Sequence, residues 1–121
     1  MISINRNGRY SFHIRFDVDG VGNLIAAFQS ALEGEQGNIE LEAITNIDNK
    51  KIASLVITCN NQQDKLSFVA SSLILELEDE VINYILDRLI KCRVGHDFYP
   101  AEFCEVSFGK NDVTIYGFLE K

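Results

Sequence analysis

The fold is decided by residues 10–34, which read YSFHIRFDVDGVGNLIAAFQSALEG. The first part alternates apolar and polar residues, as in a strand with one buried face. Its apolar members are Tyr10, Phe12, Ile14 and Phe16. From Val21 to Gly34 the apolar residues recur at helical spacing instead. The helical stripe comprises Leu24, Ile25, Phe28 and Leu32. This stretch therefore predicts a strand that leads directly into an amphipathic helix.

The second half of the chain has the same pattern. Residues 72–77, SLILEL, alternate, and residues 78–92, EDEVINYILDRLIKC, carry a helical stripe. Aligning Leu77 with Phe16 gives an offset of 61 residues, about half of the 121-residue chain. The matched pairs are then Phe12 and Leu73, Ile14 and Leu75, Val21 and Ile82, Leu24 and Ile85, Ile25 and Leu86, Phe28 and Leu89, and Gly34 and Gly95. We interpret this agreement as an internal duplication.

Further strands complete each half. Residues 38–47 and 51–59 look like two strands joined by a turn at residues 48–50. Residues 2–5 precede Asn7-Gly8, a strong signal for a two-residue hairpin, and residues 65–70 occupy the corresponding place in the second half. The prediction is an α+β protein with a tandem β-β-α-β-β repeat, a largely antiparallel sheet and two helices packed on one face.

The bulk composition predicts one globular domain. Residues 1–121 are too few for two independent cores, so the halves, about 1–60 and 61–121, share one domain. The polar run NNQQD at 60–64 is the expected link between them. The first residues, MISINRNGRYSF, lack the pattern of a secretory signal, and no apolar stretch approaches membrane-spanning length. These features predict a cytoplasmic protein.

The net charge of −7, from 18 acidic and 11 basic residues, disfavours binding to nucleic acid or to an anionic membrane. It suits capture of a basic protein partner, although an acidic surface also serves solubility. Three cysteines without C-x-x-C spacing and two isolated histidines suggest neither a disulfide framework nor a zinc site. We expect no metal and no cofactor.

Two short motifs raise the question of catalysis. Asp17-Val18-Asp19-Gly20 resembles the nucleophile motif of haloacid-dehalogenase-like phosphatases. Its counterparts in the other half, Glu78 and Glu80, also stand where a helix begins, so we interpret these carboxylates as helix-starting residues. The second motif, residues 94–106 with His96 and Cys104, could supply a base and a thiol to a small hydrolase, but a connecting loop with a buried thiol explains it more simply. We expect no catalytic residue.

Acidic residues indicate a binding face. Five acids and no lysine or arginine lie between Glu33 and Asp48. If Ile39, Leu41 and Ala43 face the helices, Glu40 and Glu42 lie on the open face of the sheet. Glu76 is expected on the same face, and Ile74 and Tyr116 are candidate apolar anchors for a partner. A solvated sheet face would also account for the charges.

Residues 24–43, LIAAFQSALEGEQGNIELEA, resemble small bacterial immunity proteins of polymorphic toxin systems. The matching residues are Leu24, Ile25, Ala27, Phe28, Gly37, Ile39 and Leu41. The resemblance implies a non-enzymatic protein that inhibits one cognate toxin, for example a nuclease, by occluding it. A secretion chaperone or adaptor that offers an exposed strand to a client is the alternative. Whether the chain forms a homodimer is left open.

Overall fold

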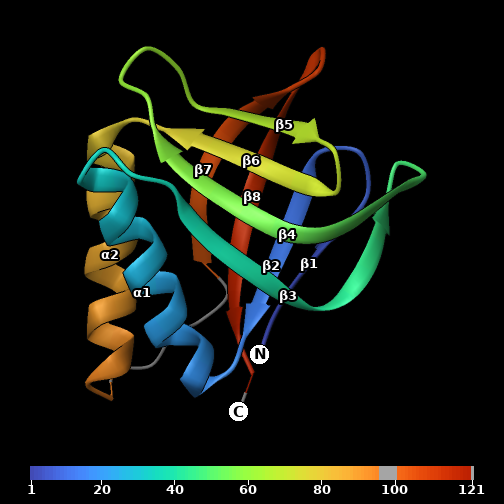
Figure 1. Ribbon diagram of the computed structural model, residues 1–121. Coiled ribbons are helices and arrows are strands. Elements are labelled where there is room, and N and C mark those ends of the chain that lie inside the picture. The colour runs from blue at the N-terminus through green and yellow to red at the C-terminus, as the bar shows by residue number, and fades with distance from the viewer. Residues whose placement is uncertain (96–100, 121) are drawn as a thin grey trace.

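A computed structural model describes residues 1–95 and 101–120, which form eight strands and two helices (Figure 1). In chain order the elements are β1 (Ile2–Arg6), β2 (Ser11–Phe16), α1 (Val18–Leu32), β3 (Gly37–Ile47), β4 (Lys50–Cys59), β5 (Lys65–Val69), β6 (Ser72–Leu77), α2 (Asp79–Arg93), β7 (Ala101–Phe108) and β8 (Asn111–Leu119). The order strand, strand, helix, strand, strand therefore occurs twice, and the fold is α+β as predicted.

All eight strands belong to one mixed sheet in the order β1-β2-β8-β7-β5-β6-β4-β3. The prediction of a largely antiparallel sheet is wrong. The four hairpins β1–β2, β3–β4, β5–β6 and β7–β8 are antiparallel, but the hairpins join one another through the parallel pairs β2–β8, β4–β6 and β5–β7. Hairpins form between neighbours in sequence and leave turn signals, whereas the parallel pairs join distant segments and leave none.

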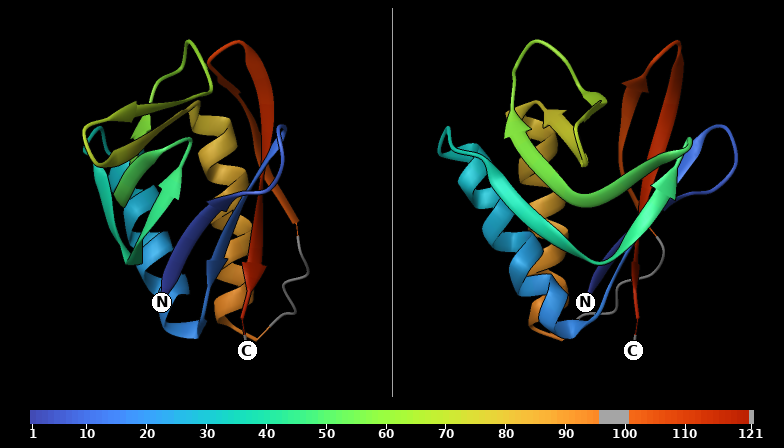
Figure 2. Two further views of the ribbon diagram at one scale, coloured as in Figure 1. Left: turned by 90° about the vertical axis from the view of Figure 1, so that its right-hand side faces the viewer. Right: turned by 45° about the vertical axis from the view of Figure 1, so that its right-hand side comes forward.

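The sheet curls into a nearly closed barrel (Figure 2). Strand β2 of the first half pairs along its whole length with β8 of the second, and β6 pairs with β4 in the same way. The β5–β7 junction is much weaker, with Lys65 and Ser107 as its one registered pair. Strands β1 and β3 stand at the two ends of the sheet order. The halves are thus interlocked, and the barrel has two weak seams.

Both helices lie on one side of the sheet, where the barrel is open (Figures 1 and 2). Their predicted apolar stripes face the core: Leu24, Phe28, Ile82 and Leu89 are fully or almost fully buried. Tyr10 is an exception, because it lies before β2 and is 59% exposed. No helix in the described part of the chain is both long enough and apolar enough to cross a membrane.

Gly37 sets the distance between α1 and β3. A Cβ atom at this position would meet the backbone of Ala27, at 2.6 Å from its carbonyl carbon and 2.7 Å from its Cα. Carbon atoms in contact normally stay about 3.5–4.0 Å apart. Glycine therefore allows the first residue of β3 to pack directly on the backbone of α1.

The two first-half hairpin turns differ from each other. Asp48 and Asn49 both have positive φ, +51° and +64°, and form the tight turn predicted between β3 and β4. The two-residue turn expected at Asn7-Gly8 is wrong, because residues 7–10 together connect β1 to β2. The N–H of Asn7 donates to the carbonyl of Ser11 at the base of this longer loop.

Candidate functional site

The candidate site is a groove between α1 and the first half of β3, with a volume of about 490 Å³. We call it the α1–β3 groove. Its lining residues are Met1, Ile2, Asn23, Ala26, Ala27, Ser30, Asn38, Ile39, Glu40 and Glu42. The helix contributes small and amide side chains, β3 contributes two acids, and Met1 carries the N-terminal ammonium, which is paired with Asp17. The lining includes two acids and no lysine or arginine.

Glu40 and Glu42, both predicted as partner-binding residues, are exposed at this groove. Within residues 1–95 and 101–120, neither carboxylate has a hydrogen-bond or ion-pair partner. Carboxylates without internal partners contribute little to folding and remain available to a cation from outside. The groove can therefore accept a cationic group.

Strand β3 is irregular beside the groove. Its pairing with β4 shifts between Glu40, which faces Ser54, and Thr45, which faces Ile52. The shift breaks the alternation of faces, so Ala43 is exposed, and the prediction that it faces the helices is wrong. Ile44, in the same irregular segment, is 67% exposed. Residues 41–44, which have no registered partner on β4, thus place the acid Glu42 close in sequence to the exposed apolar side chain of Ile44.

Ile74 and Glu76 lie on β6, which is separated from β3 by β4. Ile74 is half-buried and stands opposite Val56, whose partner on β3 is Asn38. Adjacent strands are about 4.8 Å apart, so Ile74 lies about 10 Å from β3 across the outer surface. Glu76 accepts hydrogen bonds from Asn60 Nδ2 at 2.9 Å and Gln63 Nε2 at 3.4 Å. Glu76 thus holds the loop after β4, in contrast to Glu40 and Glu42.

Tyr116 lies on β8, on the far side of the sheet order from β4 and β6. Its ring is 6.0 Å from that of His13, and His13 lies 4.6 Å from the ring of Phe118. The Arg15 guanidinium lies over Phe118 and pairs with Glu120 at 2.9 Å. Partial burial, together with the charge of Arg15, lowers the pKa of His13. Tyr116 is thus separated from the two groove acids by β1 and β2, since β1 lies beside β3.

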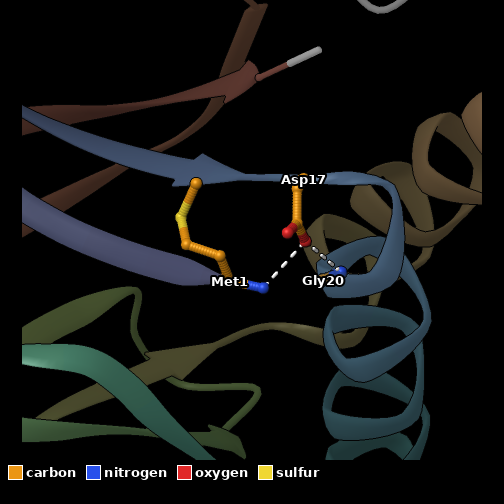
Figure 3. Close-up of polar contacts among 3 residues, drawn as sticks. All are labelled: Met1, Asp17 and Gly20. Atoms are coloured by element: carbon orange, nitrogen blue, oxygen red, sulfur yellow. Dashed lines mark hydrogen bonds and ion pairs between the residues drawn. The ribbon is translucent and has the colours of Figure 1, made fainter.

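Asp17 begins α1 (Figure 3). Its Oδ1 accepts hydrogen bonds from the Met1 ammonium and from the N–H of Gly20, both at 2.8 Å. These bonds lower the pKa of the Asp17 carboxyl, the bond from the ammonium having the larger effect. Asp19 is an exposed acid in the first turn of the helix. The helix-starting role predicted for Asp17 is confirmed, since its side chain is the N-cap.

The start of α2 is held differently. Glu78 occupies the N-cap position, but its side chain makes no capping bond. Instead, Asp64 Oδ1 accepts from the N–H of Glu78 at 2.8 Å, and Asn61 Oδ1 accepts from the N–H of Asp79 at 2.9 Å. Capping by the Glu78 side chain is therefore not found, but the prediction that acids begin α2 is confirmed, since Asp79 and Glu80 lie in its first turn. The polar run 60–64 supplies the cap as well as linking the halves.

The structure does not favour Cys104 as the nucleophile of a hydrolase. Cys104 is buried in β7, and burial strongly raises the pKa of its thiol, so the reactive thiolate is disfavoured at neutral pH. His96, Asp97 and Tyr99 lie outside the described residues. Burial also raises the pKa of Cys59. In the part of the chain described, no group of three or more His, Cys, Asp and Glu residues is arranged to hold a metal.

Sequence reasoning missed several residues of the site. Asn23, Ala26 and Ser30 line the groove from the side of α1 that lies next to its buried stripe. A polar, small-residue face beside an apolar stripe is a weak signal because it also suits a solvated helix. The exposure of Ile44 could not be predicted, because unbroken alternation along β3 does not indicate the shift in pairing with β4. The chain matches no protein-family model, and a search of curated proteins finds no match.

Proposed function

We propose that this protein is a non-enzymatic inhibitor of the immunity-protein type, which binds a cognate bacterial toxin domain through the α1–β3 groove. The observation that carries the proposal is the pair Glu40 and Glu42, exposed at one groove, without partners among the described residues. A toxin domain that acts on nucleic acid is basic, since it must approach phosphate, and a nuclease is the example that best fits a groove of this charge.

The groove supports a two-part mode of binding. The acids attract a lysine or arginine of the toxin, and the net charge of −7 adds long-range attraction. Ile44, 67% exposed beside them, is the apolar anchor that we propose seats the toxin surface. The inhibitor then acts by covering the toxin's own active site, so it needs no catalytic group.

The remaining predicted residues take secondary roles in this proposal. Ile74 lies about 10 Å from β3 and extends the contact over the outer surface of β4 and β6. Glu76 holds the loop at 60–64 and contributes charge only. Tyr116, on β8, is three strands from β3 by way of β1 and β2, and we do not include it in the proposed contact.

Co-expression tests the proposal. The protein encoded by the adjacent gene is expressed with wild type or with the double variant Glu40→Lys/Glu42→Lys, and pull-down and growth are measured. Wild type should bind that protein and rescue growth, and the variant should lose both. A neighbour that is harmless and does not bind would remove the inhibitor proposal.

A matched control separates the groove from overall charge. Glu102 and Glu105 are exposed on β7, so Glu102→Lys/Glu105→Lys changes the net charge equally. This control should bind and rescue as wild type does. Glu102 stands opposite Tyr116. Loss of binding in the control variant alone would therefore indicate that the toxin binds at Tyr116 rather than at the α1–β3 groove.

A secretion chaperone or adaptor is the second candidate, favoured by the sheet ends. In the described fold β1 and β3, at the two ends of the sheet order, lie beside each other without strand pairing, so their backbone edges become available where this seam opens. An extended client segment could add a strand there. Binding that survives Glu40→Lys/Glu42→Lys and is competed by an extended peptide of the client would favour this second function.

We also propose that the halves arose by duplication. In the two halves β2 corresponds to β6, and β4 corresponds to β8. These strands pair in the same way, since β2 lies parallel to β8 and β6 lies parallel to β4. Phe28 and Leu89, matched at the offset of 61 residues, are both fully buried. Superposition of residues 10–58 on 71–118 in an experimental structure tests this, and unlike topologies would refute it.

A further inference from the structure

A second groove, of about 640 Å³, lies at the end of the barrel where the turns gather, and its charge is opposite to that of the protein. It is lined by Arg6, Asp48, Lys50, Lys65, Leu66, Ser67, Phe68, Phe108, Gly109, Lys110 and Asn111. Figures 1 and 2 show the β3–β4 turn and the end of β1 side by side here. We call it the turn-end groove. It holds four of the 11 basic residues but one acid.

The single acid is already occupied. Asp48 Oδ2 pairs with Arg6 at 2.6 Å, and the same guanidinium donates to the carbonyl of Arg9 at 2.8 Å. Lys50, Lys65 and Lys110 have no carboxylate partner among residues 1–95 and 101–120. Lys50 and Lys65 come from separate strands and Lys110 from the β7–β8 turn, so three exposed cations line one groove and would attract an anion.

Two phenylalanines, Phe68 and Phe108, line the turn-end groove, and a cation contacts each of them. The Arg6 guanidinium lies over the ring of Phe108, 5.2 Å from its centroid, and Lys50 Nζ lies 4.5 Å from the centroid of Phe68. The rings of Phe68 and Phe108 are 5.4 Å apart in an edge-to-face arrangement. Arg6 Nε is buried without a hydrogen-bond partner in the described structure, so Arg6 is held mainly by its charge pair and by stacking.

We propose that the turn-end groove binds a small organic anion whose phosphate or carboxylate contacts the lysines while a planar ring packs against Phe68, which is half-buried beside the buried Phe108. Its volume lies within the usual range of small-molecule sites, about 300–1,000 Å³. Cationic side chains would fix the anionic end, and aromatic surface would distinguish a ring-bearing anion from inorganic phosphate. This site is separate from the α1–β3 groove and does not depend on the proposed inhibitor function.

Calorimetric titration with phenyl phosphate, inorganic phosphate and neutral benzyl alcohol tests the proposal. Phenyl phosphate should bind wild type about fivefold or more tightly than inorganic phosphate, because ring packing adds to the charge contact. Benzyl alcohol should bind weakest. The exposed double variant Lys50→Glu/Lys110→Glu should bind phenyl phosphate at least about tenfold more weakly. Phe68→Leu should reduce the preference for phenyl phosphate over inorganic phosphate.

Lys91→Glu is the charge control, because Lys91 is exposed on α2 and pairs with Asp87, away from the turns. It should bind phenyl phosphate as wild type does. Equal weakening in Lys91→Glu would show a non-specific charge effect and overturn the site. Absence of saturable binding to wild type, or equal affinity for phenyl phosphate and inorganic phosphate, would overturn it as well.

Discussion

Replacing Gly37 by alanine tests how α1 packs on the sheet. The added methyl group would meet the backbone of Ala27, with carbon–carbon distances of 2.6 and 2.7 Å where about 3.5–4.0 Å is normal. Since the obstacle is backbone rather than a flexible side chain, the helix or the strand must move by about 1 Å. We expect Gly37→Ala to lower the free energy of unfolding by about 3 kcal/mol, the upper end of the usual cost of overpacking.

Gly22→Ala is the control, because it adds the same methyl group to α1 itself, the helix that the Gly37 methyl group would meet. A Cβ at Gly22 would find no atom within 4 Å, and alanine is the better helix former. This variant should raise the free energy of unfolding by about 0.5–1 kcal/mol. Urea unfolding at 25 °C, followed by circular dichroism, measures both variants. A Gly37→Ala variant within about 0.5 kcal/mol of wild type would refute the close approach of α1 and β3.

Three further predictions concern stability and reactivity. Asp17→Asn should fold and keep the helix cap but be less stable than wild type at pH 7. Because the folded pKa of Asp17 is lowered, this deficit should begin to shrink as pH falls below about 4 and should vanish below the folded pKa; a pH-independent deficit in acid unfolding would contradict the ion pair. Phe28→Ala and Leu89→Ala should each cost about 2–5 kcal/mol in urea unfolding, and a loss below about 1 kcal/mol would deny their burial. Cys104 should react with a thiol reagent only after denaturant is added, and rapid labelling of Cys104 in native protein, located by mass spectrometry, would contradict its burial.

Local features of the fold could be predicted from the sequence. Alternation before Asp17 and helical spacing after it predict β2 and α1, and the same signals at residues 72–92 predict β6 and α2. These signals are strong because a buried face must repeat with the period of its element. The direction of pairing between distant strands carries no such signal, so the parallel pairs β2–β8 and β4–β6 were missed.

The candidate site was predictable in part. Exposed acids on β3 could be expected because Glu40 and Glu42 alternate with apolar residues. Their groove could not, because it depends on how closely α1 packs against β3 at Gly37. The irregular pairing that exposes Ile44 and Ala43 also has no clear sequence signal, since neither glycine nor proline marks it. The turn-end groove depends on four separate segments meeting, which only the tertiary fold determines.

The central claim is that acids at the α1–β3 groove guide a basic partner to this protein. Its most direct test is the association rate constant with the toxin domain encoded by the adjacent gene, measured by stopped flow at low and physiological salt. For Glu40→Lys/Glu42→Lys we expect association about tenfold or more slower at low salt, a flatter dependence on salt and a nearly unchanged midpoint of thermal unfolding. Equal rate constants for wild type and this double variant at both salt concentrations would contradict the claim.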